Sequence, residues 1–162
     1  MAIACPPGLD VVKLREEIRA IYSRVAIDPS GDFHFHRGPA YAAAMLGYDA
    51  SALAELPAEA TASFAGIANP HRIAGIAAGA TVVDIGCGAG MDLVLAARAV
   101  GPNGRAIGVD MTASMAERAR AAARTMRATQ VEVRIGDALD LPVESESADF
   151  VLSNGVLNLA PD

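Results

Sequence analysis

The chain has 162 residues, enough for one domain with a sizeable core, and 52% of them are hydrophobic. Its formal net charge of −6 argues against nucleic-acid binding, because contacts with a phosphate backbone need clustered lysines and arginines. Two cysteines, Cys5 and Cys87, do not make a disulfide framework, and no apolar stretch approaches the ~18 residues of a membrane-spanning helix, so we expect a cytoplasmic protein without nucleic-acid or membrane partners.

The first predicted element is an amphipathic helix that follows Asp10 and ends near Asp28-Pro29. Its apolar residues recur at three- and four-residue steps with charged residues between them, and Asp10 has the side chain of an N-cap. We interpret this helix as a packing element that covers a core.

A loop over residues 30–39 follows and contains Phe33-His34-Phe35-His36. Two histidines two residues apart share one side of an extended segment, which is compatible with metal binding. Because no third ligand lies nearby in the sequence, we expect no metal site here.

Short helices are predicted over 40–46 and 50–56, and Pro57 ends the second of them. Glycines and Asn69-Pro70 interrupt every period in 58–79, which predicts a loop with short helical turns near the mouth of a pocket. His71 in this segment is expected to be a surface residue. We expect residues 1–79 to form an N-terminal helical cap and pocket-entrance segment.

From residue 80 onward, apolar strands alternate with helical stretches. Strands are predicted over 81–85, 105–109, 131–135 and 149–153, and helices over 91–100 and 113–127, with Thr112 as the N-cap of the second helix. This alternation is typical of a parallel α/β sheet with right-handed crossovers. We expect residues 80–162 to form this part.

The turn after the first strand carries three alternating glycines, Gly86, Gly88 and Gly90. We expect Gly86 to permit a tight exit from the strand, Gly88 to let a ligand approach the backbone, and Gly90 to let helix and strand pack closely. Asp110 ends the next strand, where a carboxylate can accept both hydroxyls of a ribose. The combination predicts a pocket for an adenosine ligand.

The spacing of the glycines distinguishes between adenosine ligands. A dinucleotide turn runs G-x-G-x-x-G, whereas Met91 stands here in place of its third glycine, which disfavours a nicotinamide-dependent oxidoreductase. With Asp84 the pattern becomes D-x-G-x-G-x-G, which resembles motif I of the class I S-adenosylmethionine-dependent methyltransferases. Gly136-Asp137-Ala138 resembles the adenine-binding corner of that family, and the stretch from Asp149 to Asn154 resembles its fourth strand.

This resemblance implies a Rossmann-like class I methyltransferase fold, S-adenosylmethionine as cofactor, S-adenosylhomocysteine as product, and a small-molecule acceptor. It also implies that the acid of the adenine corner accepts the exocyclic amine of adenine, and that the end of the fourth strand faces the methionine moiety. No residue stands out as a catalytic base. The implied cofactor-binding residues are Asp84, Gly86, Cys87, Gly88, Gly90, Asp110, Met111, Gly136, Asp137, Ala138 and Asn154.

Further stretches resemble the arsenite methyltransferase-like branch of the family, namely 46–48, 66–70, 108–112 and 153–162. Arsenic methyltransferases hold As(III) with thiolates, but Ile67 and Gly155 stand at two of the cysteine positions, and a third would follow Asp162. We therefore do not expect arsenite methylation by this chain alone. Cys87 lies inside the cofactor turn and is expected to be a small buried filler.

A class I methyltransferase sheet has seven strands, of which the sequence supplies about four. We therefore expect a truncated enzyme or a short protein, with an unpaired apolar edge at strand 149–153 that a second copy or another polypeptide covers. The alternative to an active methyltransferase is a non-catalytic remnant that binds the cofactor weakly or serves as an assembly module.

Overall fold

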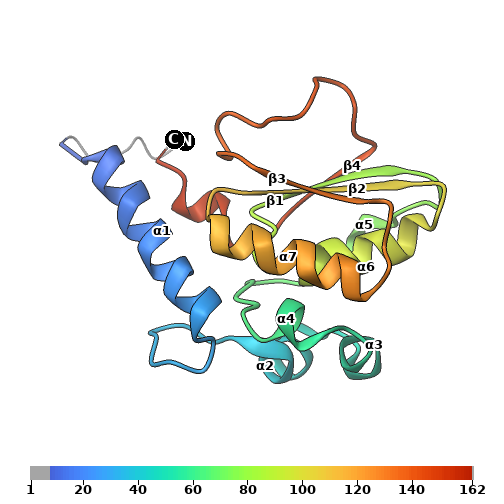
Figure 1. The fold of residues 1–162 in the computed structure, drawn as a ribbon, viewed down its shortest axis with the longest axis horizontal. Coiled ribbons are helices and arrows are strands. Elements are labelled where there is room, and N and C mark those ends of the chain that lie inside the picture. Colours follow the sequence, from blue (N-terminus) through green and yellow to red (C-terminus); the bar gives the residue numbers. More distant parts are fainter. Residues whose placement is uncertain (1–7, 162) are drawn as a thin grey trace.

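The computed structural model describes residues 8–161, which form a parallel sheet, the helices packed against it and an N-terminal helical segment (Figure 1). The strands are β1 (Thr81–Ile85), β2 (Arg105–Asp110), β3 (Val131–Ile135) and β4 (Phe150–Ser153). The crossover helices are α6 (Met91–Val100) and α7 (Ala113–Thr125). The remaining elements are α1 (Val11–Ile27), α2 (Gly38–Leu46), α3 (Ala50–Ala54), α4 (Ala58–Thr61), α5 (His71–Ala74) and the 3₁₀ helix η1 (Leu157–Leu159).

The predicted elements agree with these bounds, and the differences lie at helix and strand ends. Asp10 is the N-cap of α1, and its side chain accepts the backbone N–H of Lys13 at 3.0 Å. Thr112 occupies the N-cap position of α7, but its side chain makes no capping bond. Helix α7 ends at Thr125 and not at residue 127, because Arg127 adopts a left-handed backbone conformation with φ 52°.

The sheet has the strand order β3-β2-β1-β4, and every strand pair is parallel. Helices α6 and α7 lie on one face of the sheet, while the connection from β3 to β4 passes over the opposite face (Figure 1). The order therefore reverses between β1 and β4. In open parallel sheets, ligands bind beyond the carboxyl ends of the strands at such a reversal. The glycine turn and Asp110 both lie at these carboxyl ends.

The core between the sheet and the crossover helices is made of small and branched apolar side chains. Val82 and Leu152 pack with α6 in one cluster, and Leu93 packs with Ala106 and Ala119 in another. Burying a side chain such as Leu93 contributes about 1.5–3 kcal/mol relative to exposing it. This packing fixes the ends of β1 and β2, and therefore the residues that follow them.

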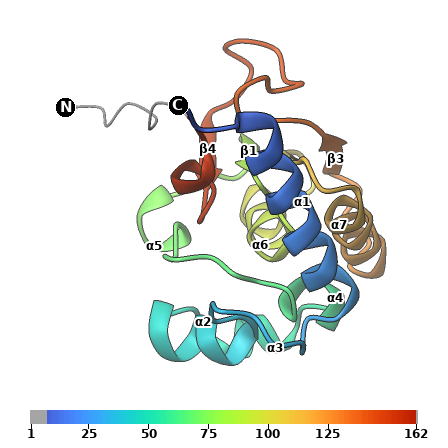
Figure 2. The same ribbon diagram turned by 90° about the vertical axis from the view of Figure 1, so that its left-hand side faces the viewer.

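The N-terminal helices share the core of the sheet half. A cluster joins Tyr48, Leu53 and Phe64 to Met91 and Val94 of α6. Helix α1 lies beside α7, with α2, α3 and α4 at its lower end (Figure 2). The predicted helical cap is therefore packed against both crossover helices.

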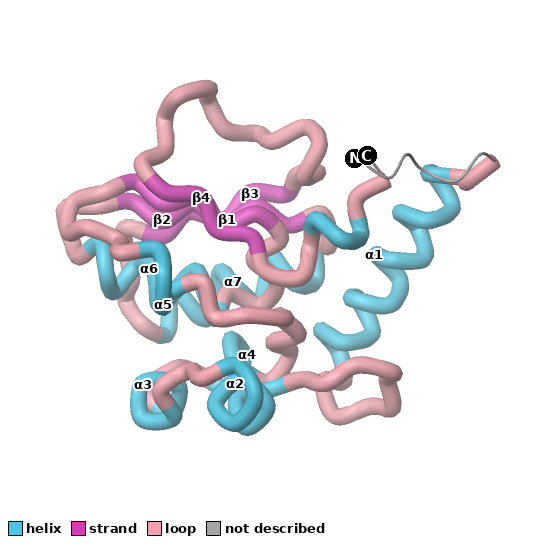
Figure 3. Tube along the Cα trace, turned by 180° about the vertical axis from the view of Figure 1, so that it is seen from behind, coloured by secondary structure: helices cyan, strands magenta, loops and turns pink. Residues whose placement is uncertain are grey.

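The outer side of β4 has no neighbouring strand among residues 8–161, which confirms the predicted open edge. Val151 in the middle of β4 is 60% exposed. The connection from β3 to β4 contains no helix and forms a long loop on the far side of the sheet (Figure 3). In the described part of the chain, no helix is long and apolar enough to cross a membrane.

Candidate cofactor-binding site

The glycine turn leaves β1 in a conformation that L-residues rarely adopt. Gly86, Gly88 and Gly90 have φ values of 69°, 53° and 93°. The N–H groups of Gly86 and Cys87 both donate to the carbonyl of Val109, at 2.7 and 3.1 Å, and so tie the turn to β2. The turn is therefore held at the junction of two strands.

Gly88 and Gly90 differ in what surrounds them. A Cβ added at Gly88 would meet no heavy atom within 4 Å, and this residue lines the pocket described below. A Cβ added at Gly90 would lie 3.1 Å from the Cα and Cβ of Ala119 in α7. We predicted that Gly90 allows a helix to pack closely against a strand. The close contact at Gly90 instead joins α6 to another helix, α7.

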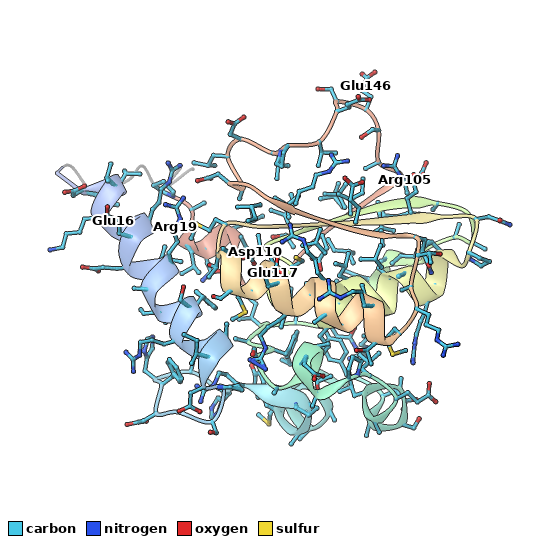
Figure 4. The ribbon with its side chains drawn as sticks, viewed as in Figure 1. Glu16, Arg19, Arg105, Asp110, Glu117 and Glu146 are labelled. Atoms are coloured by element: carbon cyan, nitrogen blue, oxygen red, sulfur yellow. The ribbon has the colours of Figure 1, made fainter. Side chains whose placement is uncertain are left out.

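Asp110 lies at the carboxyl end of β2, close to the start of α7 (Figure 4). Its Oδ2 accepts the N–H of Gly88 at 2.8 Å, and its Oδ1 accepts the N–H of Thr112 at 2.8 Å. Burial raises the pKa of the Asp110 carboxyl, although these two bonds oppose the shift. The carboxylate is thus oriented by backbone groups on both sides and has lone pairs left for a ligand.

Asp84 is the most deeply buried acid of the site, with 2% of its surface exposed. Its Oδ2 has no hydrogen-bond partner within residues 8–161. Burial raises the pKa of Asp84 well above its usual range, and the nearby carboxylates of Asp92 and Asp110 add to the shift. An unpartnered buried carboxyl oxygen of this kind fits a ligand that brings a cation or a hydrogen-bond donor.

One pocket gathers the residues that the sequence predicted, from four separate segments of the chain. It is lined by all the predicted cofactor-binding residues except Gly90, which is the N-cap of α6. These residues are Asp84, Gly86, Cys87, Gly88, Asp110, Met111, Gly136, Asp137, Ala138 and Asn154. The pocket is also lined by 63–66, as expected for a segment at its mouth.

Helix α1 supplies a wall of the pocket that sequence reasoning missed. Arg15, Ile18 and Tyr22 line the pocket, and Arg15 forms an ion pair with Asp137 at 3.3 Å. The second oxygen of Asp137, Oδ1, accepts the N–H of Leu139 at 2.9 Å. The amphipathic pattern predicted the helix, but it could not show that part of the buried face meets a ligand pocket.

Asn154 follows β4 and lines the pocket, but the protein itself satisfies its amide. Its Oδ1 accepts the N–H groups of Ile67 and Ala68 at 2.8 and 3.1 Å. Its Nδ2 lies 2.9 Å from Asp92 Oδ2 and 2.8 Å from the carbonyl of Ala68. Asn154 therefore joins the end of β4 to the pocket-entrance segment, and its contact with the cofactor stays a prediction.

The carboxylate of Asp92, in the first turn of α6, is the centre of this polar network. Tyr48 donates its hydroxyl to Asp92 Oδ1 at 2.7 Å, and His71 Nε2 lies 3.1 Å from the same oxygen. Burial and the negative charge of Asp92 raise the pKa of Tyr48. The expectation that His71 is a surface residue was wrong, since its side chain is only 19% exposed.

The two cysteine positions of the arsenite branch face each other across a short distance. A Cβ built at Gly155 would lie 3.8 Å from Cγ2 of Ile67. Cys87 is a buried free thiol that packs beneath the turn, as expected for a small filler. Cys5 lies outside the described residues. Among residues 8–161, no cluster of three or more histidines, cysteines or acids could hold a metal, the loop with His34 and His36 included.

The sequence matches a family model described as a methyltransferase domain, over residues 76–162. This match covers more than half of the chain. The chain belongs to the S-adenosylmethionine-dependent methyltransferase family. The cofactor of this family is S-adenosylmethionine, as the sequence resemblance implied.

Two relatives indicate which members of the family the chain is similar to. An arsenite methyltransferase from Halobacterium salinarum is 47% identical over 117 residues, which cover 72% of this chain and 30% of the relative. A demethylmenaquinone methyltransferase from Oceanobacillus iheyensis is 33% identical over 54% of this chain and 37% of its own length. The chain is thus arsenite-methyltransferase-like, and it spans about a third of the length of these relatives.

A solved structure agrees with this assignment. The arsenic(III) S-adenosylmethionine methyltransferase from Chlamydomonas reinhardtii superposes with a TM-score of 0.62 at 38% identity, over 69% of this chain and 40% of that one. The predicted Rossmann-like methyltransferase fold is confirmed.

The residues of the pocket fit the cofactor of the family. Gly88 leaves open the space into which a Cβ would point, and Asp84 offers an unpartnered buried oxygen. Asp110 offers an oriented carboxylate at the end of β2. The site thus has room, a hydrogen-bond acceptor for a ribose and a group that suits an ammonium.

Proposed function

We propose that this chain binds S-adenosylmethionine through the glycine turn and transfers its methyl group to a small molecule by in-line displacement. The observation that carries the proposal is the carboxylate of Asp110, which the N–H groups of Gly88 and Thr112 hold beside an open glycine turn. The other predicted binding residues along the pocket are Gly86, Cys87, Met111, Gly136, Asp137 and Ala138.

The protein's contribution to such a reaction is mainly positioning. S-adenosylmethionine supplies an activated methyl group, because its sulfonium is already a good leaving group. Asp110 would hold the ribose with the lone pairs that its backbone partners leave free, and Asp84 would accept from the ammonium. Holding donor and acceptor in line removes the entropic cost of their encounter, which accounts for much of the rate enhancement in such reactions.

We propose that the acceptor is not As(III), because a soft thiophilic ion needs soft ligands and the described residues offer none at the matching positions. Ile67 stands at one of these positions, and Gly155, which has no side chain, stands at the other. A methyl-transfer assay with arsenite and small organic thiols tests this point. Methylation of arsenite by this chain at a rate comparable to that of any other acceptor would contradict it.

We also propose that a second copy of the chain pairs with the open edge of β4. The exposed Val151 and the unpaired backbone of an edge strand support this assignment. Light scattering of the purified chain tests it. A monomeric mass at micromolar concentration would leave the edge open and contradict the dimer.

Calorimetry with S-adenosylhomocysteine tests cofactor binding directly. We expect binding of S-adenosylhomocysteine and no binding of NAD. Asp110→Ala should weaken the affinity about tenfold or more, because a hydrogen bond to a charged group is worth ~1.5–3 kcal/mol. Asp32→Ala removes an exposed carboxyl away from the pocket and should leave the affinity unchanged. Binding of NAD in place of S-adenosylhomocysteine would contradict the proposal.

The alternative, a remnant that binds the cofactor without turnover, predicts the same calorimetry but no product. A methyl-transfer assay with a panel of small nucleophiles separates the two. We favour the active enzyme because the family model and the similar proteins are all described as methyltransferases.

A further inference from the structure

Helix α1 presents three residues to the cofactor pocket, and their spacing places them on one side of the helix. Arg15, Ile18 and Tyr22 are three and four residues apart, which is the repeat of a helix face. The helix stands beside α7 (Figure 2), on the side of the molecule where Asp110 ends β2 (Figure 4). The pocket is thus bounded by the sheet on one side and by α1 on another.

The hydroxyl of Tyr22 is a free hydrogen-bonding group next to the ribose-side carboxylate. Within residues 8–161, this hydroxyl makes no hydrogen bond, although Tyr22 is partly buried and lines the pocket with Asp110. Burial raises the pKa of Tyr22, and the negative charge of Asp110 raises it further. A tyrosine hydroxyl on a pocket wall with no hydrogen-bond partner among the described residues is free to bond a ligand in that pocket.

The ring of Tyr22 is held in place by the aromatic loop over residues 30–39. Phe35 stacks on Tyr22 with ring centroids 6.0 Å apart, and Phe33 packs against Phe35 at 5.7 Å. The guanidinium of Arg37 lies 4.3 Å from the centroid of Phe33 and donates to the carbonyls of Pro29, Gly31 and Phe35. This loop therefore supports α1 through the stacking of Phe35 on Tyr22.

Arg15 lies about two helical turns before Tyr22 on the same face of α1, beside Asp137. Its guanidinium pairs with Asp137 Oδ2, while the backbone of Leu139 holds the other oxygen. The carboxylate of Asp137 is thereby fixed from two directions. A fixed carboxylate loses less entropy on accepting a ligand N–H than a free one does.

We propose that α1 is the adenosine-side wall of the cofactor pocket, in which Tyr22 bonds a ribose hydroxyl beside Asp110 and Arg15 positions Asp137 for adenine. This assignment rests on the proposed function, since it uses the same pocket and the same cofactor. It adds binding groups from an element that is distant in sequence from every glycine-turn residue. Tyr22 is a direct binding residue, whereas Arg15 acts through Asp137.

Calorimetry of S-adenosylhomocysteine binding to Tyr22→Phe tests the direct contact. We expect a three- to tenfold weaker affinity, which corresponds to about 0.6–1.4 kcal/mol and is the size of one neutral hydrogen bond. Tyr41→Phe is the matched control, because Tyr41 is partly buried against His36 and does not line the pocket. The 2′-deoxy and 3′-deoxy analogues of S-adenosylhomocysteine identify the hydroxyl, since the effect of Tyr22→Phe should vanish for the analogue that lacks it.

The positioning role of Arg15 needs its own variants. Arg15→Ala should weaken binding of S-adenosylhomocysteine two- to fivefold, and Arg15→Lys, which keeps the charge, should restore most of the affinity. Lys13→Ala removes an exposed charge from the same helix, outside the pocket, and should have no effect.

The outcomes separate this inference from the proposed function. If the unmodified chain does not bind S-adenosylhomocysteine, the proposed function fails and the inference fails with it. If the unmodified chain binds but Tyr22→Phe and Tyr41→Phe bind equally well, only the inference is overturned. The inference is also overturned if Tyr22→Phe loses the same affinity for S-adenosylhomocysteine and for both deoxy analogues. That result would indicate a general disturbance of the pocket and not a contact with one hydroxyl.

Discussion

The two halves of the molecule build the same pocket by different means. The sheet half, residues 80–161, places its pocket-lining groups at strand ends, so each group lies within a few residues of a strand that orients it. The N-terminal half, residues 8–79, reaches the pocket only through tertiary contacts, with Tyr22 on α1 and 63–66 in a loop. The comparison teaches that local sequence can set up recognition of a cofactor, while closure of its pocket depends on residues far apart in the chain.

Two kinds of contact join these halves. One is the apolar cluster in which Phe64 and Tyr48 pack with Met91 and Val94. The other is the polar network around Asp92, where side chains from the N-terminal half and from the end of β4 meet. Buried networks of this kind are stabilising only while every member has its partners. Substitutions in each half and at the link between them therefore test the comparison.

The largest effect is expected from a change inside the sheet half, at Gly90. Gly90→Ala places a Cβ 3.1 Å from Ala119 in α7, on a residue with φ 93°. Left-handed strain of about 1–2 kcal/mol and crowding of about 1–3 kcal/mol together predict a loss of about 2–5 kcal/mol in the free energy of unfolding. Urea denaturation followed by circular dichroism measures this loss.

The matched control is a glycine in the N-terminal half with the same backbone requirement but open surroundings. Gly75 has φ 55°, and a Cβ there would meet nothing within 4 Å. Gly75→Ala should therefore lose only about 1 kcal/mol. Equal losses for Gly90→Ala and Gly75→Ala would show that the close packing of α6 on α7 is not what Gly90 provides.

The second-largest loss of stability is expected at the polar network around Asp92, which links the two halves. Asn154→Ala removes the hydrogen bonds to Asp92 and to the backbone of Ile67 and Ala68, and should lower the free energy of unfolding by about 1–3 kcal/mol. The amides of Ile67 and Ala68 should also exchange with deuterium faster than in the unmodified chain. Hydrogen exchange followed by NMR measures this local effect, which a general loss of stability would not confine to two amides.

Asn158→Ala serves as the comparison variant, since Asn158 is exposed in η1 and makes no side-chain hydrogen bond within the described residues. We expect it to match the unmodified chain in both measurements. If Asn154→Ala behaves like Asn158→Ala, the polar network does not join the two halves, and the apolar cluster alone carries that role.

The sequence predicted the sheet half well because its determinants are local. Strand periodicity, the alternating glycines and the acid at the end of β2 are each patterns of a few neighbouring residues. The structure brings Asp84, Gly88 and Asp110 together in one pocket, as expected. Asn154 shows the limit of such prediction. Its position after β4 was correct, but its partners Ile67 and Ala68 lie 87 and 86 residues away, and no short-range pattern records them. Arg15 and Asp137 form an ion pair although they are also far apart in the sequence, and no short-range pattern predicts it.

The smallest effect is a change in the pH dependence of stability, and it comes from Asp84, where the sheet half meets the network. Burial and the neighbouring acids raise the pKa of Asp84 in the folded state above the unfolded value of about 3.9. The folded chain therefore holds this proton more tightly than the unfolded chain does. The resulting stabilisation is complete below about pH 4 and is lost as the pH rises through the folded pKa. Asp84→Asn cannot titrate, so the free energy of unfolding of this variant, relative to the unmodified chain, should increase with pH.

Urea denaturation at several pH values between 5 and 8 measures that difference, and Asp32→Asn, at an exposed site, should run parallel to the unmodified chain. If the free energy of unfolding of Asp84→Asn also runs parallel to that of the unmodified chain, the pKa of Asp84 is not raised in the folded state. Saturating S-adenosylhomocysteine sharpens the test, because its ammonium should favour the ionised form of Asp84 and so reduce the pH dependence of the unmodified chain. Such a reduction would identify the unpartnered Oδ2 of Asp84 as a ligand contact of the sheet half, made independently of the closure that α1 provides.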